Sequence, residues 1–332
     1  MNVNNALKKM DPVMEKVLSG ISGSLSEGFD TGSVLEGKRY RAYLFFALSR
    51  RDDKESLMTA SALEIVHAAT LVHDDIIDGG ILRRSRPALH MVKGVPAGIL
   101  YGDLLFNAAF GLLAELSDPE IWKEFHKAVS LVVSGEVDQQ LKRADVRMRE
   151  SEYMDIIERK TGALFALACR LGGMAECRNS DEIGSLAGFG RTLGTVYQIL
   201  DDCMDLLEHG RDKTNRRDIQ NGVMTLPLIA AFEKDREGLR ELFAELPMPE
   251  ERVAVVVHKA IVSGGLKKAV KRASDLMEEA VTGLPEGYMS PGGPVRGMVR
   301  KLMKKVEYVK KEDTDLRRRF CGDQRLEQAG KT

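Results

Sequence analysis

The sequence Leu71-Val-His-Asp-Asp-Ile-Ile-Asp78 decides the fold, because a second segment, Asp201-Asp-Cys-Met-Asp205, repeats its acidic spacing far downstream. On an α-helix, two residues four positions apart lie on nearly the same face, about 6 Å apart along the helix axis. We therefore expect Asp74 to face outward with Asp78, and Asp201 with Asp205. A structural protein would rarely carry this arrangement twice, so we expect both clusters to serve the same function.

Carboxylates that lie this close repel one another, which costs stability unless cations or strong donors lie between them. Apolar residues surround both clusters, among them Leu71, Ile76 and Ile77 around the first and Ile199 and Leu200 around the second. Such embedded acids differ from a surface charge run. Hard oxygen ligands with room for water and phosphate oxygens suit Mg²⁺ better than a soft-ligand metal. The clusters therefore predict two facing acidic helices that hold Mg²⁺ and, through it, a diphosphate, although a single cluster would favour a solvated acidic turn.

The composition argues against nucleic-acid binding. The chain of 332 residues carries 49 Lys and Arg against 50 Asp and Glu, which leaves a net charge of -1 and no overall basic excess. With 43% hydrophobic residues, it can bury a core. Any anion-binding site must therefore be local.

The cysteines and the N-terminus favour a cytoplasmic protein. The four cysteines, Cys169, Cys177, Cys203 and Cys321, are scattered and form no CxxC pair. This usage is typical of free thiols in a reducing compartment. The segment that starts at Met1 lacks the apolar region of a signal peptide.

A long stretch without proline predicts an all-α fold. No proline occurs between Glu120 and Leu226, and apolar residues recur at helical spacing through Trp122, Phe125 and Val129. The most apolar stretch of the chain, residues 97–116, contains one aspartate and one asparagine. We expect it to be a buried helix, with no stable membrane insertion.

The rest of the chain is consistent with one helical domain. The β-like run Val253-Ala-Val-Val-Val257 is followed by Gly264-Gly265, and we interpret it as the buried side of a helix that the glycines end. No segment resembles an inter-domain linker. We therefore expect a single domain over residues 1–332, with a core from about 35 to 310 and a charged tail at 311–332.

A second anion site is indicated by Gly37-Lys-Arg-Tyr-Arg41, which places three cations directly after a glycine. A loop that lets the backbone approach, followed by convergent Lys and Arg, can bind an anion, although alone it is more often a solvated helix start. His67 lies seven residues before Asp74, two helical turns earlier on roughly the same face. A lone histidine at such a position is usually a partly buried side chain whose hydrogen bonds are formed within the protein.

Six motifs now resemble, in their order, the trans-isoprenyl diphosphate synthases of the polyprenyl synthetase family. They are Gly37-Lys-Arg-Tyr-Arg41, Leu71-Val-His-Asp-Asp-Ile-Ile-Asp-Gly-Gly-Ile-Leu-Arg-Arg84, Tyr101-Gly-Asp-Leu-Leu105, Lys160-Thr-Gly162, Tyr197-Gln-Ile-Leu-Asp-Asp-Cys-Met-Asp205 and Asn221-Gly-Val-Met-Thr-Leu-Pro227. The resemblance covers about residues 35 to 230. It implies a single all-α isoprenoid-synthase bundle around a deep central cavity, usually in a homodimer.

The resemblance also implies head-to-tail (1'-4) condensation of isopentenyl diphosphate with an allylic diphosphate, in the presence of Mg²⁺ with up to three ions per site. The metal ligands would be Asp74, Asp78 and Asp201, with Asp75, Asp202 and Asp205 in support.

The remaining motif residues would bind the two substrates. Arg83, Lys160 and Gln198 would contact the allylic diphosphate, and Lys38, Arg41, His67 and Arg84 would hold isopentenyl diphosphate. Thr161 and Gln198 would stabilise the allylic cation by their dipoles. Water must be excluded, because it would trap this cation as an alcohol.

The residues before the first acidic cluster predict the product length. Val66, Ala69 and Thr70 precede Asp74 by one to two turns, and none of them is aromatic. A floor of small residues would leave room for a growing chain. We therefore expect a product of C20 or longer.

The sequence departs from the family pattern at two places. Ser85 stands where a glycine usually follows the arginine pair, and Val223 stands where a lysine is expected before Thr225-Leu-Pro227. A second loop lysine aligns with Lys213 or Thr214 only after a shift. These lysines help to neutralise the diphosphate, so their loss raises the alternative of a partner-dependent or non-catalytic subunit of a heteromeric synthase.

Two other enzyme classes remain as alternatives. A class I terpene cyclase or head-to-head condensing enzyme shares paired acidic motifs and Mg²⁺, but it has no need of the cations that would hold isopentenyl diphosphate. A helical metal phosphohydrolase built on His73-Asp74 leaves the cluster from Asp201 to Asp205 unexplained. Elongation assays with labelled isopentenyl diphosphate would separate these classes.

Overall fold

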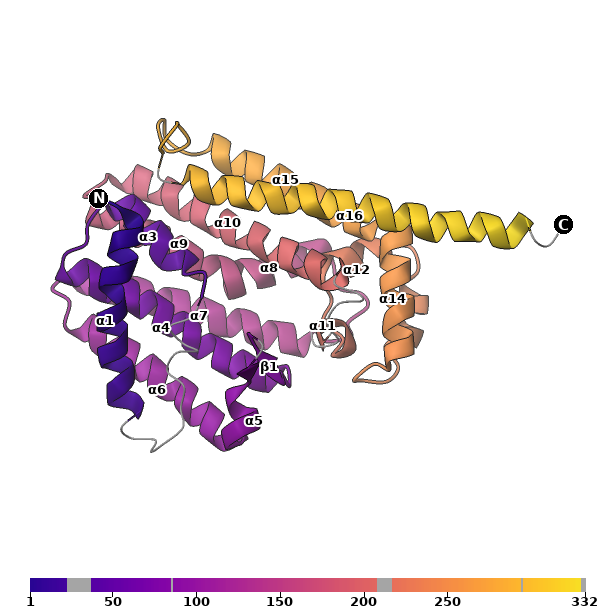
Figure 1. The fold of residues 1–332 in the computed structure, drawn as a ribbon, viewed down its shortest axis with the longest axis horizontal. Helices are drawn as coiled ribbons and strands as arrows, with labels where there is room; N and C mark the ends of the chain where they lie inside the picture. The colour runs from indigo at the N-terminus through magenta and orange to yellow at the C-terminus, as the bar shows by residue number, and fades with distance from the viewer. Residues whose placement is uncertain (23–36, 85, 208–216, 294, 330–332) are drawn as a thin grey trace. The chain divides into compact units, whose positions relative to one another are not determined.

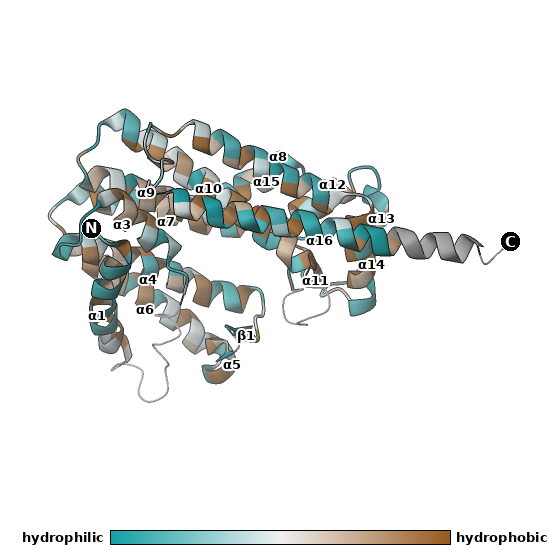
Figure 2. Cartoon of the chain, turned by 45° about the horizontal axis from the view of Figure 1, so that its top comes forward, coloured by the Kyte–Doolittle hydropathy of each residue, from teal (hydrophilic) through white to brown (hydrophobic). Residues whose placement is uncertain are grey.

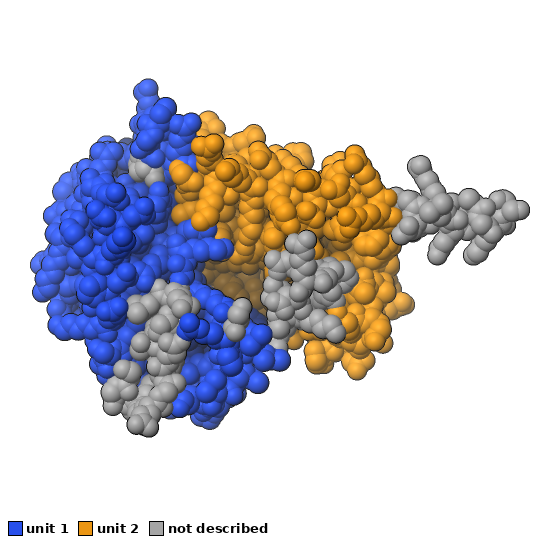
Figure 3. Space-filling model, in the orientation of Figure 1, with its two compact units in different colours: residues 1–132, 162–191, 283–296 blue, residues 133–161, 192–282, 297–332 orange. Residues whose placement is uncertain are grey.

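The structure, a computed structural model, describes residues 1–22, 37–84, 86–207, 217–293 and 295–329; for residues 22, 217 and 321–329 it describes the backbone only. The chain forms two compact units that alternate along the sequence (Figure 3). Unit 1 comprises Met1–Val132, Gly162–Arg191 and Gly283–Arg296, and unit 2 comprises Val133–Thr161, Thr192–Thr282 and Gly297–Thr332.

Helices dominate both units, as the sequence predicts (Figure 1). Those of unit 1 are α1 (Val3–Ser22), α3 (Tyr40–Ser49), α4 (Lys54–Ile77), α5 (Leu89–Lys93), α6 (Val95–Ala114) and α9 (Ala163–Ala175). Those of unit 2 are α8 (Glu150–Ile157), α11 (Arg217–Gln220), α12 (Leu226–Ala231), α13 (Arg236–Leu242), α14 (Glu250–Val262) and α15 (Gly265–Thr282). The π-helix η1 (Glu158–Gly162) and α16 (Arg296–Ala329) belong almost entirely to unit 2, whereas α7 (Pro119–Leu141) and α10 (Ser180–Leu207) contribute residues to both units.

One short hairpin interrupts the helices of unit 1. Strands β1 (Leu82–Arg83) and β2 (Arg86–Pro87) pair antiparallel, with Leu82 opposite Pro87 and Arg83 opposite Arg86. Within the described residues they form the one sheet. The hairpin directly follows the first acidic cluster and fixes the arginines there.

Helix α4 is the central helix of unit 1 and packs against α1, α3, α6 and α9. It begins at an N-cap, where the Asp53 carboxylate accepts a hydrogen bond from the Ser56 N–H at 3.0 Å. A β-carbon on Gly102 of α6 would lie 2.1 Å from His73 Nε2 of α4. The glycine therefore allows the two helices to approach closely just before the acidic cluster.

The interpretation of the β-like run is confirmed, because Val253–Val257 lies within α14. Val253, Val256 and Val257 are buried and Val255 is exposed, which is the pattern of an amphipathic helix. Gly264, whose φ of 84° is in the left-handed region, lies directly after the C-cap of this helix.

Helix α6 corresponds to the apolar stretch that we expected to be buried, but it is buried only in part. It packs against α1, α4 and α5, while Val95, Ile99 and Leu100 are exposed. By length and composition alone, α6 could also cross a membrane. The sequence could not reveal the exposed face, because α6 is apolar around most of its circumference.

The predicted boundary of the charged tail lies inside one helix. Helix α16 runs without a break from Arg296 to Ala329, so residue 310 marks no change of structure. Buried residues such as Leu302, Val306 and Val309 recur at helical spacing along α16. Figure 2 shows this amphipathic pattern as brown positions among teal ones.

Candidate functional site

The first acidic cluster lies at the C-terminal end of α4 in unit 1. Asp74 and Asp75 belong to the last turn, and Asp78 is the C-cap. The Asp78 N–H donates to the Asp74 carbonyl at 2.9 Å, so the helical spacing predicted for these two residues is confirmed. Gly79, with a φ of 66°, then turns the chain into the hairpin.

Arg83 binds the middle carboxylate of this cluster. Its Nε donates to both oxygens of Asp75, at 2.8 and 3.0 Å. Burial opposes the charge on Arg83, but the bond to Asp75 and the charges of Asp74 and Asp78 raise its pKa. A cationic side chain therefore neutralises part of the negative charge of the cluster.

The structure brings together, in unit 1, most of the basic residues predicted to bind diphosphates. His67 of α4 is half-buried and lies close to Arg41, Arg83 and Arg84; desolvation, followed by these three positive charges, holds its pKa well below the usual range. His67 is therefore neutral at pH 7 and can donate or accept a hydrogen bond. Three arginines therefore lie around one half-buried imidazole in a chain with almost no net charge, and that they bind an anion stays a prediction.

Two backbone features position these cations. The Ala42 N–H at the start of α3 donates to the buried Glu64 carboxylate of α4 at 2.9 Å, which fixes the helix turn that carries Arg41. A β-carbon on Gly37 would lie 2.9 Å from Arg84 Nη2, so the glycine that precedes Lys38 allows the Arg84 guanidinium to approach this loop. Arg41, His67 and Arg84 thus lie close together within unit 1, and that they hold isopentenyl diphosphate together with Lys38 stays a prediction.

The predicted product-length residues lie on α4. Val66 and Ala69 are fully buried, and Thr70 is half-buried. The Thr70 hydroxyl donates to the His67 carbonyl at 2.8 Å, so its polar atom is satisfied by its own helix. The side chain at position 69 therefore has no exposed surface into which a larger residue could turn.

The second acidic cluster lies on α10 in unit 2. Asp201, its first residue, forms an ion pair with Lys305 of α16. The Lys305 ammonium also lies 5.3 Å from the centre of the Tyr197 ring, one turn earlier on α10. Asp205, at the other end of the cluster, also belongs to α10.

Asp202 differs from its neighbour because it points into the interior of unit 2. Its oxygens accept hydrogen bonds from the Tyr153 hydroxyl at 2.7 Å and from the Gln198 amide at 2.8 Å. The Gln198 carbonyl in turn accepts from the Thr161 hydroxyl at 2.8 Å. Burial, and to a lesser degree the charges of Asp218 and Asp201, raise the pKa of Asp202 to about 7. The predicted residues Thr161, Gln198 and Asp202 therefore form one hydrogen-bonded chain.

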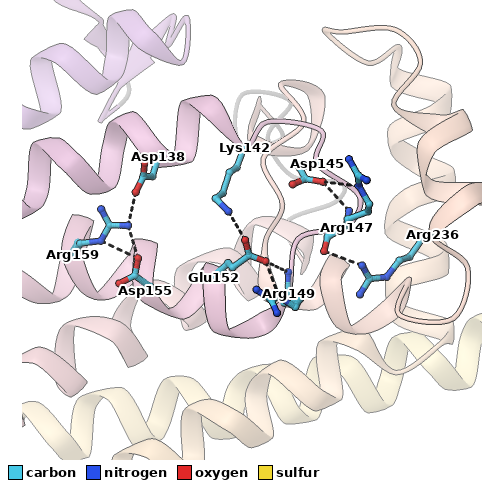
Figure 4. Close-up of polar contacts among 9 residues, drawn as sticks. All are labelled: Asp138, Lys142, Asp145, Arg147, Arg149, Glu152, Asp155, Arg159 and Arg236. Atoms are coloured by element: carbon cyan, nitrogen blue, oxygen red, sulfur yellow. Dashed lines mark hydrogen bonds and ion pairs between the residues drawn. The ribbon is translucent and has the colours of Figure 1, made fainter.

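Lys160 and Thr161 belong to the π-helix η1, a distortion that often marks functional sites. The Lys160 ammonium forms an ion pair with Glu136 of α7. A β-carbon on Gly135 would lie 2.8 Å from the backbone nitrogen of Lys160. Arg159 holds η1 in place, because it donates to Asp138 at 2.7 Å and also binds Asp155 (Figure 4).

The segment between α7 and α8 is tied down by a second set of ion pairs in Figure 4. Glu152 binds Lys142 and, at 3.1 Å, the Arg149 guanidinium. These contacts, the one to Lys142 first, lower the pKa of Glu152 to about 2. Arg236 donates to the Arg147 carbonyl at 2.9 Å. The loop that precedes α8 is thus attached to its neighbours within unit 2.

The departure at Val223 lies in a buried turn of unit 2. Val223 is 7% exposed, and its N–H donates to the Asp218 carbonyl at 2.8 Å. Burial raises the pKa of the Asp218 carboxyl, while the charges of Lys160 and Arg143 lower it. These two cations lie near the turn in which the family pattern places a lysine. Ser85 and the loop that contains Lys213 and Thr214 are outside the described residues.

The chemistry of the donors fits Mg²⁺. Both clusters offer carboxylate oxygens, and in each of them one carboxylate already binds a side-chain cation, Arg83 on Asp75 and Lys305 on Asp201. Among the residues that the structure describes, no group of three or more His, Cys, Asp and Glu side chains could hold an ion. Mg²⁺ does not require one, because it commonly takes one or two carboxylates together with water and substrate phosphates. That the two clusters face each other stays a prediction.

Several residues of this site were missed from the sequence. Four residues that are distant in the sequence lie against or near predicted site residues in the folded chain: Tyr153, Glu136, Asp218 and Lys305. Lys305 lies 104 positions after its partner, in a helix with many lysines. Of these four residues, Asp218 lies nearest to a motif along the chain, three positions before Asn221.

The sequence matches a known family and known proteins over most of its length. The Polyprenyl synthetase family model matches residues 24–261. A short chain isoprenyl diphosphate synthase from Methanothermobacter thermautotrophicus is 34% identical over 270 residues, which are 74% of this chain and 82% of that protein.

Solved structures share the fold. The heptaprenyl diphosphate synthase from Staphylococcus aureus has a TM-score of 0.79 at 23% identity, over 92% of this chain and 98% of that chain. A polyprenyl synthase from Caulobacter crescentus CB15, complexed with calcium and isoprenyl diphosphate, has a TM-score of 0.74 at 26% identity, over 94% of this chain and 98% of that chain. The expected all-α isoprenoid-synthase fold is confirmed.

Proposed function

Because the chain belongs to the polyprenyl synthetase family and is an isoprenyl diphosphate synthase, we propose that it condenses isopentenyl diphosphate head-to-tail with an allylic diphosphate. The reaction would depend on Mg²⁺ and would yield a trans-polyprenyl diphosphate.

One observation in unit 1 carries this proposal. The carboxylates at the end of α4 lie next to Arg83, and Arg83 lies with Arg41 and Arg84 around the neutral His67. Carboxylates that could bind a metal ion and cationic side chains that could bind a diphosphate are thus adjacent in one compact unit. A terpene cyclase would need the carboxylates but has no isopentenyl diphosphate for which a separate set of cations would be required.

The chemistry follows from these groups. Bound Mg²⁺ would neutralise the leaving diphosphate, so that the allylic C–O bond can ionise. Lys38, Arg41, His67 and Arg84 would hold isopentenyl diphosphate so that its double bond attacks the allylic cation. A C–C bond then forms and a proton is lost to the departing diphosphate.

Residues of unit 2 would assist this step. We assign Lys160 to the allylic diphosphate and the Thr161–Gln198 pair to the allylic cation, whose charge their oxygens would face. Asp202 and Tyr153 would position Gln198, because the amide nitrogen is bound to the Asp202 carboxylate. Asp74, Asp78 and Asp201 would bind the metal.

We propose a product of C20 or longer. The similar proteins include a short chain isoprenyl diphosphate synthase and a heptaprenyl diphosphate synthase, so similarity does not fix the product length. The support comes from α4, where the fully buried Ala69 precedes the acidic cluster and no aromatic side chain occupies its turn.

We also propose a cytoplasmic homodimer. The exposed apolar residues Val95, Ile99 and Leu100 on α6, with Met91 and Val92 of α5 before them, form a surface that a second copy of the chain would cover. Cys169, Cys177 and Cys203 are free thiols, which agrees with a reducing compartment.

The test is an elongation assay on the full chain with Mg²⁺, labelled isopentenyl diphosphate and allylic primers of several lengths. We expect chain-elongated diphosphates that require both substrates and disappear when a chelator is added. The Asp74→Asn variant should lose about two or more orders of magnitude in kcat, because it removes a ligand at the point where charge develops. A product formed without isopentenyl diphosphate would contradict the proposal.

A partner-dependent synthase is the second candidate, and the buried Val223 favours it. An apolar side chain here removes one positive charge from the turn that follows the second acidic cluster. If this candidate is correct, the chain alone would show no elongation activity in the assay, and addition of a second synthase subunit would restore elongation. The Val223→Lys variant would then gain activity without the partner.

A further inference from the structure

A lysine of the C-terminal helix reaches the second acidic cluster within unit 2. Lys305 of α16 makes two contacts with one turn of α10, an ion pair with Asp201 and a cation–π contact with Tyr197 at 5.3 Å. Asp201 is the residue of this cluster that we assign to the metal. A protein cation therefore already binds the carboxylate that a metal ion would use.

The backbone of Lys305 is fixed, but its side chain is not enclosed. Leu302, Val306 and Val309 of the same helix are buried, so α16 is anchored on both sides of the lysine. The side chains of Lys305 and Asp201 are 24% and 34% exposed. The ammonium thus has solvent beside it, and its flexible stem allows it to leave the carboxylate while the helix stays in place.

We propose that Lys305 competes with Mg²⁺ for Asp201 and thereby lowers the affinity of the second acidic cluster for metal. The inference rests on the proposed function, because it takes Asp201 as a metal ligand. An ammonium and a divalent cation at contact distance from the same carboxylate repel each other, so the metal binds Asp201 only after the ammonium has moved away. The Tyr197 ring gives the displaced ammonium a second, weaker contact near its first position.

A purely positioning role for Lys305 makes the opposite prediction. If the ion pair held Asp201 in the geometry that the metal requires, removal of the ammonium would weaken metal binding. If the lysine competes with the metal, its removal strengthens binding. The sign of the change in metal affinity therefore separates the two roles without an activity measurement.

The experiment uses the full-length protein and its Lys305→Met variant, which keeps an apolar stem against Tyr197 and removes the charge. Mn²⁺ is the probe, and its binding is measured by water-proton relaxation and by calorimetry. A partly exposed ion pair contributes at most about 1 kcal/mol, so we expect the dissociation constant of the variant to be roughly two- to fivefold lower. Lys304→Met is the matched control, because it removes the same charge from an exposed neighbouring position of α16.

A double-mutant cycle with Asp201→Asn completes the test. In that background, Lys305→Met should no longer change the affinity for Mn²⁺. The inference is overturned if Lys305→Met leaves the affinity unchanged, weakens it, or changes it no more than Lys304→Met does. If the wild-type protein binds Mn²⁺ and elongates substrates while this occurs, only the inference fails; if it binds no metal, the proposed function fails as well.

Discussion

Adjacent residues of one motif have different environments in this protein. Asp201 lies at the surface of unit 2 and binds Lys305, whereas Asp202 is buried between Tyr153 and Gln198. Consecutive residues on an α-helix point about 100° apart, so one can face a ligand while the next faces the core. The repeated aspartate pattern in the sequence therefore combines metal-binding and structural carboxylates.

His67 makes stability depend on pH. Its pKa is below the ordinary 6.5 in the folded protein, so as the pH falls the unfolded chain takes up this proton first. The contribution of His67 to the free energy of unfolding is thus complete above about pH 7 and is lost as the pH falls through the ordinary pKa. We expect the His67→Gln variant to lose less stability than the wild type between about pH 7 and about pH 5.

Urea denaturation of both proteins at several pH values measures this difference. The control is His126→Gln, which replaces an exposed histidine of α7. Its free energy of unfolding should change with pH as that of the wild type does. Parallel pH profiles for the wild type and His67→Gln would show that His67 does not carry the effect.

Ala69 is the position at which product length should respond most directly. A larger side chain there cannot turn toward solvent, because Ala69 is fully buried. We expect Ala69→Leu to shorten the main product and Ala69→Phe to shorten it further, as chromatography of the dephosphorylated products would show. Added volume in a packed core costs about 1–3 kcal/mol, so thermal denaturation must first confirm that both variants fold. A folded variant with the wild-type product distribution would refute this role.

The helices of this chain were largely predictable, and their distortions and exposed faces were not. Helix α7 lies in the proline-free stretch that predicted helices, apart from Pro119 at its start, and α14 contains the valine run that we assigned to a helix. The π-helix η1 could not be predicted, because its Glu-Arg-Lys-Thr-Gly sequence is compatible with an ordinary helix and contacts from α7 and α8 hold it. Local sequence specifies the type of an element more strongly than its packing.

The close approach of α4 and α6 depends on Gly102. A β-carbon there would lie 2.1 Å from His73 Nε2, so we expect Gly102→Ala to lower the free energy of unfolding by about 1–3 kcal/mol. Gly111→Ala on the same helix is the control, because a β-carbon there has no atom within 4 Å. The control should gain about 0.5–1 kcal/mol, since alanine favours a helix more than glycine does. Equal effects of the two substitutions in urea denaturation would contradict this packing argument.

At the scale of the whole molecule, the sequence indicated the residue types of the site but not the two compact units, and the single domain stays a prediction. The predicted site residues from Lys38 to Arg84 belong to unit 1, whereas those from Lys160 to Asp205 belong to unit 2. Lys305 contacts the second acidic cluster from α16, in a part of the predicted core to which the sequence assigned no function. Contacts between distant segments are set by tertiary packing, to which a single sequence gives little access.

The proposed dimer can be tested on the exposed face of α6. Leu100 is 60% exposed, and a charge at this position would be desolvated if a second copy covered it. We expect Leu100→Glu to shift the protein toward the monomer in sedimentation experiments. Val255→Glu, at an exposed position of α14, should leave the mass unchanged. A wild type that sediments as a monomer would refute the proposed dimer.

The alternation of segments between the two units has a consequence for biosynthesis. Unit 1 is completed by residues 283–296 and unit 2 by residues 297–332, so neither core is complete until almost the whole chain has been translated. While the chain is attached to the ribosome, helix α12 of unit 2, for example, is made before its neighbours α14 and α15. Chaperone binding during translation, and loss of both units after a truncation before residue 283, are the expected results.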